Sequence, residues 1–372
     1  MNGQWMGQYA GSNTGSIIVN MDDRDDHYEG MAFLIDSNSK LPAIAASVKT
    51  NDKARTIQLK TSTIRSINPH TLFIDSWESV KEFYPDVTFP NEADVKGDWN
   101  EERLILNWAT NIGTSGWATL PKSKAGTPSE NIPLVKITDW ESYKRYVSSL
   151  ESRRYLFRGQ NEPRRLRTKF HRSGRADLGR FVSNDIQTLH KHLSARTRHI
   201  FNLNIPDENG AFFNLVQHHG YPTPLLDWTY SPYVAAFFAY HRISNSDAAK
   251  ALDNAKVRIF IFDQKIWRND LIQVQFLNTP HPHFSILEFI AIDNERMIPQ
   301  QAASSVTNID DIETYIKSKE TKEKKYLQII DLPVKERTKV MGELSHMGIT
   351  AGSLYPGLDG ACEELKERFF KI

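Results

Sequence analysis

Short runs of alternating apolar and polar residues dominate the first third of the chain. Asp, Asn, Gly and Pro separate five runs rich in β-branched or aromatic residues, which are residues 16–21, 28–35, 56–59, 71–74 and 103–108. A period of two places alternate side chains on opposite faces of a strand, and such residue types favour strands. The pattern therefore predicts a small antiparallel β-barrel or sandwich.

The pattern changes after a segment with linker composition. Residues 121–129 contain two Pro, one Gly and two Ser between the two regions. We place the domain boundary inside this segment, which gives a β-rich domain over residues 1–126 and a second domain over residues 127–372.

Helices and strands are mixed in the second domain. Val182, Ile186, Leu189 and Leu193 recur at helical spacing. Ser231 and Pro232 form a strong helix start, with a serine N-cap and a proline at the first helical position. Strands are expected at 155–159, 256–262, 284–292 and 326–330, so this domain is predicted to be α+β.

The composition is that of a soluble globular protein. Of 372 residues, 40% are hydrophobic and 24% are charged, and a chain of this length can bury a core without disulfides or structural metal. Cys362 is the only cysteine, which excludes an internal disulfide and favours a reducing compartment. With no secretory signal pattern and no membrane-spanning apolar run, the expected location is cytoplasmic, without a membrane partner.

Positive charge is concentrated in one block. Residues 151–200 hold eleven Arg and two Lys against four acidic residues, a local net charge of +9, whereas the whole chain carries +1. Such a block attracts a phosphate-bearing ligand, either a nucleotide or a nucleic acid, and guanidinium groups suit bidentate phosphate contacts. The alternative is that acidic residues from elsewhere balance it in three dimensions.

Two segments carry the candidate chemistry, the run Tyr-Leu-Phe-Arg-Gly-Gln at 155–160 and the polar and aromatic stretch at 217–232. An arginine on a largely apolar strand needs an anionic partner, because burying it unpaired is costly. For Arg158 this partner is either Asp227 or a ligand phosphate held bidentately. Gly159 permits close approach of the backbone to a planar ligand.

From about residue 140 to the C-terminus, these motifs resemble the FRG domain, a bacterial family named for its Phe-Arg-Gly signature. The hydroxyl pair Thr229 and Ser231 before a helix is similar to the Ser-Thr-Ser element of arginine-type ADP-ribosyltransferases. The resemblance implies an α+β fold with an ADP-ribosyltransferase split β-sheet. It also implies that Arg158 holds the phosphates or nicotinamide ribose of NAD, and that the Gly159 backbone bonds the nicotinamide amide.

This resemblance extends to further site residues. It implies catalytic roles for Arg158, Thr229, Ser231, Glu295, Gln300 and Gln301. It implies NAD contacts by Phe157, Arg158, Gly159, Gln160, His218, His219, Tyr221, Asp227 and Trp228. Ser231 has the alternative role of helix N-cap, and Trp228 is either core or a stacking wall for a flat ring.

A carboxylate near the ribose is the third element that the transferase chemistry needs, because bond cleavage passes through an oxocarbenium-like state. The late segment 294–305 contains Glu295 and the pair Gln300-Gln301, but neither Gln-x-Glu nor Glu-x-Glu. A glutamine at this place can bond a ribose hydroxyl but does not stabilise the cation by charge.

No metal site is expected. The adjacent His218 and His219 point about 100° apart on a helix, and no thiolate or i,i+4 ligand accompanies them. The sequence also lacks a phosphate-binding Gly-x-x-x-x-Gly-Lys loop and a Gly-x-Ser-x-Gly nucleophile elbow.

Two functional hypotheses follow. The first is an NAD-consuming effector, an ADP-ribosyltransferase or NAD glycohydrolase, with NAD as substrate, an unknown protein or nucleic-acid target and the first domain as sensor or target-recognition module. By analogy, such an effector fits a toxin or an anti-phage defence role. The alternative is a non-catalytic module that binds a nucleotide or RNA in an Arg-lined cleft.

Overall fold

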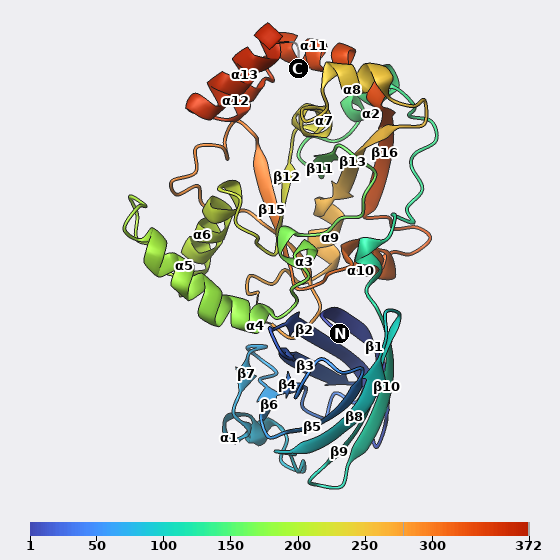
Figure 1. Cartoon of the computed structure of the whole chain (residues 1–372), viewed down its shortest axis with the longest axis vertical. Coiled ribbons are helices and arrows are strands. Elements are labelled where there is room, and N and C mark those ends of the chain that lie inside the picture. The colour runs from blue at the N-terminus through green and yellow to red at the C-terminus, as the bar shows by residue number, and fades with distance from the viewer. Residues whose placement is uncertain (278, 371–372) are drawn as a thin grey trace.

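The chain folds into a strand-rich N-terminal part and a mixed helix-and-strand C-terminal part, which are stacked along its longest axis (Figure 1). The computed structural model describes residues 1–277 and 279–370. In these residues no helix combines the length and the apolar character that crossing a membrane requires. The mixed α+β class is confirmed.

The N-terminal part contains one ten-stranded antiparallel sheet, with the order β5-β8-β9-β10-β1-β2-β3-β4-β6-β7. Its strands are β1 (Gly3–Gly11), β2 (Gly15–Asp23), β3 (Tyr28–Asp36), β4 (Ile44–Lys49), β5 (Thr56–Thr61), β6 (Ile64–Ile67), β7 (Ile74–Asp75), β8 (Ala93–Trp99), β9 (Arg103–Thr110) and β10 (Ser115–Pro121). The short helices α1 (Trp77–Val80), η1 (Lys81–Phe83) and η2 (Lys124–Gly126) accompany it.

The predicted antiparallel strands are therefore present, but a closed barrel is wrong. The sheet ends at β5 and β7, which do not pair with each other, and all ten strands belong to one sheet. It encloses an apolar core that includes Trp5, which is 1% exposed and donates from Nε1 to the Met1 carbonyl at 2.7 Å. Side chains alternate between buried and exposed positions in an open curved sheet as well as in a closed barrel. The sequence pattern alone therefore does not show whether the sheet closes.

The C-terminal part is built on a six-stranded antiparallel sheet with the order β14-β15-β12-β11-β13-β16. Its strands are β11 (Tyr155–Gln160), β12 (Leu225–Thr229), β13 (Lys256–Asp263), β14 (Phe284–Leu287), β15 (Ala302–Thr307) and β16 (Leu327–Pro333). Its helices are α2 (Trp140–Ser148), α3 (Lys169–Arg172), α4 (Leu178–Arg180), η3 (Phe181–Asp185), α5 (Ile186–Leu193), α6 (Pro206–His218), α7 (Pro232–Tyr240), α8 (Asn245–Lys250), α9 (Gln264–Asp270), α10 (Ile312–Lys319), η4 (Val334–Glu336), α11 (Arg337–His346), α12 (Ala351–Leu354) and α13 (Leu358–Phe370).

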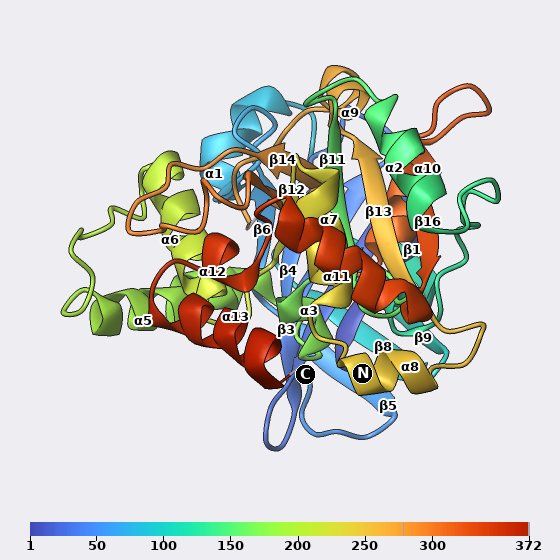
Figure 2. The ribbon, with the colours of Figure 1, turned by 90° about the horizontal axis from the view of Figure 1, so that it is seen from above.

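Strand β11 lies in the middle of this sheet and contributes to the cores on both faces. Phe157 packs with α7 and α11 in one core, whereas Leu156 packs with Trp228 and Phe260 in the other. Successive side chains of a strand point to opposite faces, which accounts for this division. Figure 2 shows α7 and α11 lying over the sheet.

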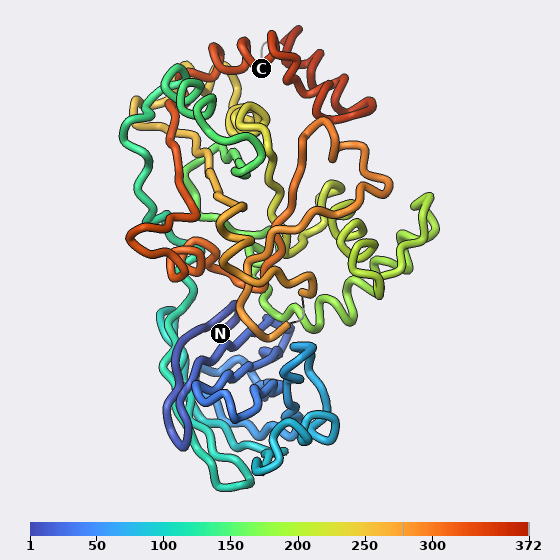
Figure 3. The backbone as a smooth tube through the Cα atoms, turned by 180° about the vertical axis from the view of Figure 1, so that it is seen from behind, coloured from blue at the N-terminus to red at the C-terminus, as the bar shows by residue number. Residues whose placement is uncertain are grey.

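The two parts meet along β2, β3 and the segment around α4 (Figure 3). The carboxylate of Asp22, 1% exposed, accepts hydrogen bonds from Arg175 Nε at 2.8 Å and from the backbone N–H groups of Ala176 and Asp177 at 2.7 and 3.1 Å. Arg180 donates to Glu29 at 2.7 Å. These contacts fasten the C-terminal part to the N-terminal sheet.

Candidate functional site

Arg158 lies at the point where the C-terminal sheet separates. Strand β11 pairs with β13 along its whole length, but its register with β12 contains the single pair Phe157 and Thr229. Beyond this pair, Arg158 Nη1 donates to the Asp227 carbonyl oxygen at 2.6 Å. The arginine side chain thus binds the neighbouring strand where the ladder between the two strands has stopped. Its Nε is buried and has no hydrogen-bond partner within the described residues.

A chain of side-chain hydrogen bonds holds Asp227 from the other side. Buried Gln217, at the end of α6, donates from Nε2 to Asp227 Oδ1, and the Thr223 hydroxyl donates to Gln217 Oε1. Asp227 is half-buried, and its Oδ2 accepts no hydrogen bond from the residues that the structure describes. The roles of Gln217 and Thr223 were not predicted, although both lie within the stretch at 217–232.

Asp227 lies near two cations, Arg158 and Lys169, and further cations lie near these two. Burial lowers the pKa of the Arg158 guanidinium to about 10. The charge of Asp227 acts to raise this pKa, whereas the charge of Arg172 acts to lower it. Burial also lowers the pKa of Lys169. Asp227 acts to raise this pKa, whereas the positive charges of Arg172, Arg242 and Arg158 lower it further. Arg158, Arg172 and Arg242 therefore all lie close enough to Lys169 to repel it, and among the described residues Asp227 is the carboxylate that acts on both Lys169 and Arg158. We call Arg158, Lys169, Arg172 and Arg242 the cation cluster.

Gly159 serves packing between a helix and a strand. A Cβ atom at this position would lie 1.9 Å from the Ala235 carbonyl oxygen and 2.7 Å from the Ala239 nitrogen, both in α7. The close approach that the sequence suggested for a planar ligand is thus made by α7. The backbone of Gly159 lies opposite Ile259 in the ladder with β13.

The hydroxyl pair Thr229 and Ser231 is engaged locally. Thr229, 3% exposed, donates to the Gln300 carbonyl at 2.7 Å and accepts from the Ser231 N–H at 3.0 Å. Ser231 Oγ accepts from the Val234 N–H at 3.2 Å, so the N-cap prediction is confirmed. Both hydroxyls stabilise the passage from β12 into α7.

The aromatic and histidine residues of the motif lie in different surroundings. Trp228 is 2% exposed, belongs to the core and donates from Nε1 to Ser305 Oγ at 2.9 Å. His218 Nδ1 lies 2.8 Å from Asn294 Oδ1, whereas His219 is exposed. Tyr221 stacks on Phe181.

Two further residues flank Arg158 on β11. Phe157 is a buried core residue, and half-buried Gln160 lies opposite Arg258 of β13. Across the described part of the chain, no group of three or more His, Cys, Asp or Glu side chains is arranged to hold a metal ion.

The three candidates of the late segment lie in different surroundings. Glu295 and Gln301 are exposed, and Gln301 has a left-handed φ of 45°. Gln300 is buried and donates from Nε2 to the Leu354 carbonyl at 2.9 Å, while its own carbonyl accepts from Thr229. Gln300 therefore ties β12 to α12. No described contact joins Glu295 to Arg158.

Ion pairs neutralise much of the basic block at 151–200. Acidic residues lie within ion-pair distance of six of its arginines, which are Arg154, Arg164, Arg165, Arg167, Arg175 and Arg180. Most of these partners come from distant parts of the chain, such as Asp310 and Asp22. No ion pair of the described residues includes a member of the cation cluster, and Asp227 is the carboxylate whose charge acts on Arg158 and Lys169.

The fold and this site define a two-part α+β protein in which a central arginine bridges two separating strands. Residues 153–248 match the family model of the FRG domain, so this part of the chain is an FRG domain. The matched residues include Arg158, Asp227 and every member of the cation cluster. Neither a search of curated proteins nor a search of solved structures found a match.

Proposed function

We propose that the FRG domain binds the phosphates of a nucleotide at the cation cluster, and that this nucleotide is NAD, which the protein consumes. The observation that supports the proposal is the excess charge: Arg158, Arg172 and Arg242 all act on Lys169, and Asp227 is the carboxylate that opposes them there. A diphosphate would supply the missing negative charge, and guanidinium groups bind phosphate oxygens bidentately. The unpartnered Nε of Arg158 leaves a donor for such a contact once the side chain shifts.

In this proposal, Asp227 is the carboxylate for cleavage of the nicotinamide–ribose bond. The bonding pair leaves with the nicotinamide ring nitrogen, positive charge develops on the ribose, and water adds to yield ADP-ribose, nicotinamide and a proton. A fixed carboxylate stabilises the developing cation. Gln217 holds one oxygen of Asp227 and leaves the other available. Glu295 is exposed and has no described contact with the cluster.

The test is to incubate the full chain with NAD and to measure nicotinamide by chromatography. Nicotinamide released by hydrolysis, with water as the acceptor, can be measured without knowledge of an ADP-ribosylation target. Asp227→Asn is expected to lower the rate at least about 100-fold while NAD still binds, since its loss removes charge stabilisation. Arg158→Ala is expected to lose both binding and release. Glu295→Gln is the matched control and should retain activity.

Folding of each variant is checked by circular dichroism. Undiminished nicotinamide release from folded Arg158→Ala would rule out the proposed role of the cation cluster. Loss of release in Glu295→Gln with full activity in Asp227→Asn would move the carboxylate role to Glu295.

A second candidate is a module that binds a nucleotide or RNA without cleaving it. The observation in its favour is that Gln217 already occupies one oxygen of Asp227 and that, among the residues the structure describes, Asp227 is the carboxylate that acts on Arg158. It predicts NAD or RNA binding without nicotinamide release. Filter binding of single-stranded RNA should then weaken steeply as salt rises, because phosphate contacts release counterions.

The wider role proposed for an NAD-consuming protein is that of a toxin or an anti-phage effector, with the N-terminal sheet as sensor or target-recognition module. This role would be supported by depletion of NAD in cells that make the intact chain. Cells that make Arg158→Ala should then grow and keep their NAD. Normal NAD levels during expression of the active wild-type chain would contradict it.

A further inference from the structure

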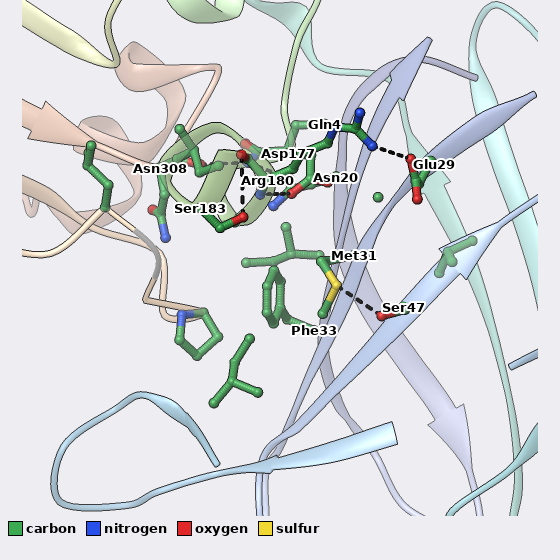
Figure 4. Close-up of a pocket in the computed structure, with 18 of the residues that line it drawn as sticks. Gln4, Asn20, Glu29, Met31, Phe33, Ser47, Asp177, Arg180, Ser183 and Asn308 are labelled. Atoms are coloured by element: carbon green, nitrogen blue, oxygen red, sulfur yellow. Dashed lines mark hydrogen bonds and ion pairs between the residues drawn. The ribbon is translucent and has the colours of Figure 1, made fainter. Parts of the chain in front are cut away.

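A cavity of about 400 Å³ lies between the N-terminal sheet and the FRG domain (Figure 4). Strands β2, β3 and β4 form one wall. The other wall is formed by α4 and η3 together with Leu277, Thr279, Pro280 and Asn308. This volume falls in the range of small-molecule sites, which are commonly formed where two domains meet. None of the cation cluster lines the cavity.

The apolar side of the cavity suits the face of a flat ring. Phe33 and Met31 project into it from β3, as Figure 4 shows. Leu178 and Leu277 contribute from the opposite wall. Aromatic and thioether side chains favour contact with a second aromatic ring.

The polar side offers hydrogen-bonding groups that the protein does not use. Thr279 is 4% exposed, and its Oγ1 is buried with no hydrogen-bond partner in the described chain. Asn20 accepts from Gln4 through Oδ1, while its Nδ2 makes no hydrogen bond within the described residues. Buried polar groups are normally satisfied, so a ligand or water must meet these donors and acceptors.

Charges around the cavity balance. Its charged lining residues are Glu29, Lys49, Asp177 and Arg180, two of each sign. Arg180 donates to Glu29 at 2.7 Å, and Asp177 Oδ1 accepts from the Arg180 N–H at 3.1 Å. No net charge is left to attract an ion, which favours an uncharged ligand.

A distortion of the helix marks the same wall. Ser183 and Asn184 line the cavity from η3, a π-helical turn between α4 and α5. Such turns are rare and are frequent at functional sites.

We propose that this cavity binds an uncharged nucleoside or a related heteroaromatic molecule that bridges the two parts of the chain. The ring lies between Phe33, Met31 and Leu178, and its polar edge bonds to Asn20 Nδ2 and Thr279 Oγ1. Heteroaromatic rings combine a flat apolar face with donors and acceptors at the edge, which matches both sides of the cavity. This binding is independent of NAD consumption at the cation cluster.

The experiment is equilibrium dialysis of the full chain with adenosine, guanosine, cytidine and uridine. At least one of them is expected to bind below about 1 mM. Ser183→Phe, which fills the cavity from η3, should weaken this binding more than about tenfold. Gln187→Phe adds the same ring at an exposed position of α5 outside the cavity and should leave binding unchanged.

Ser47→Phe fills the cavity from β4 and repeats the test if Ser183→Phe does not fold. Arg158→Ala should keep nucleoside affinity even though it abolishes nicotinamide release, so the two sites fail separately. The inference is overturned if none of the four nucleosides binds, if both filled variants bind as the wild type does, or if Arg158→Ala removes nucleoside binding.

Discussion

The guanidinium of Arg158 and the main-chain oxygen of Asp227 are joined by a 2.6 Å hydrogen bond across the gap between β11 and β12. Strand pairing between them is limited to Phe157 and Thr229. A side chain therefore satisfies a carbonyl oxygen next to the place where two central strands separate. Because the same arginine belongs to the cation cluster, the integrity of the sheet and the proposed chemistry of the site depend on one residue.

Replacement of this arginine should cost stability as well as ligand binding. In Arg158→Ala the Asp227 oxygen loses its charged donor, and we expect the free energy of unfolding to fall by about 1–3 kcal/mol. Arg158→Lys retains the charge but not the planar fork, so it should recover part of the stability and little of the phosphate affinity. Urea unfolding and NAD titration measure the two effects; equal stability of the wild type and the alanine variant would contradict the bridging role.

Gly159 is expected to tolerate no side chain. The Cβ of Gly159→Ala would lie 1.9 Å from a carbonyl oxygen of α7, so the helix must move, at a cost of about 1–3 kcal/mol. Gly342→Ala, at an exposed position of α11 where an added Cβ meets nothing within 4 Å, should instead stabilise by about 0.5–1 kcal/mol. Thermal unfolding of both variants tests this contrast. A destabilised Gly342→Ala with an unaffected Gly159→Ala would refute it.

Removing one cation from the cluster should weaken nucleotide binding selectively. Arg172→Ala or Arg242→Ala is expected to lower NAD affinity by about threefold to tenfold, with a smaller loss in high salt, because screening shortens electrostatic interactions to about 8 Å at physiological ionic strength. The control is Arg196→Ala, which removes an exposed arginine of the same basic block. Calorimetric titration at two salt concentrations separates these variants. Equal losses in all three would mean that overall charge, not the cluster, governs binding.

Two buried histidines should make the protein sensitive to acid. Burial lowers the pKa of His171 and of His283 to about 4. The unfolded chain protonates these groups near pH 6.5 and so binds more protons than the folded chain between about pH 6.5 and 4. The free energy of unfolding should fall across this window as pH is lowered, by up to about 3 kcal/mol for each histidine.

Urea unfolding at several pH values measures this dependence. His171→Asn should reduce its slope, because the titrating group is removed while a polar atom remains near Thr168. His219→Asn, at an exposed position, should leave the slope unchanged. A slope in His171→Asn equal to that of the wild type would show that His171 does not contribute.

Asp22 should be required for the contact between the two parts. Asp22→Ala leaves Arg175 Nε and two backbone N–H groups without their acceptor, and we expect a loss of about 1–3 kcal/mol. Limited trypsin digestion should then cut the 121–129 segment faster. Asp25→Ala removes a neighbouring exposed carboxylate and provides the control. Unchanged digestion of Asp22→Ala would show that other contacts hold the two parts together.

Local sequence signals were sufficient to predict several helices and strands. The run at 155–160 forms β11, and Ser231 caps α7 as expected. Both depend on interactions within a few residues, alternation along a strand and a side-chain bond to the nearby Val234 N–H. The strand expected over 284–292 ends at Leu287 in β14, so its limit depends on pairing with β15 and not on apolar character alone.

The site was predictable only in part. The motif pointed to Arg158 and Asp227, yet the bond between them uses the Asp227 backbone oxygen, which no side-chain pattern reveals. The sequence likewise did not show that α7 is the neighbour that lies against Gly159. Glycine allows close approach by any neighbour, and its position in the chain does not say which neighbour arrives.

Sequence by itself determined the antiparallel strands of the first part and the FRG motif, because these follow from periodicity, turn residues and neighbouring side chains. Tertiary structure decided that the first sheet stays open, that distant carboxylates pair with five of the eleven arginines in the basic block, and that Arg158, Arg172 and Arg242 lie close to Lys169. The physical reason is that sheet closure and charge balance depend on which remote segments meet, whereas local patterns constrain only the residues that share a strand or a helical turn.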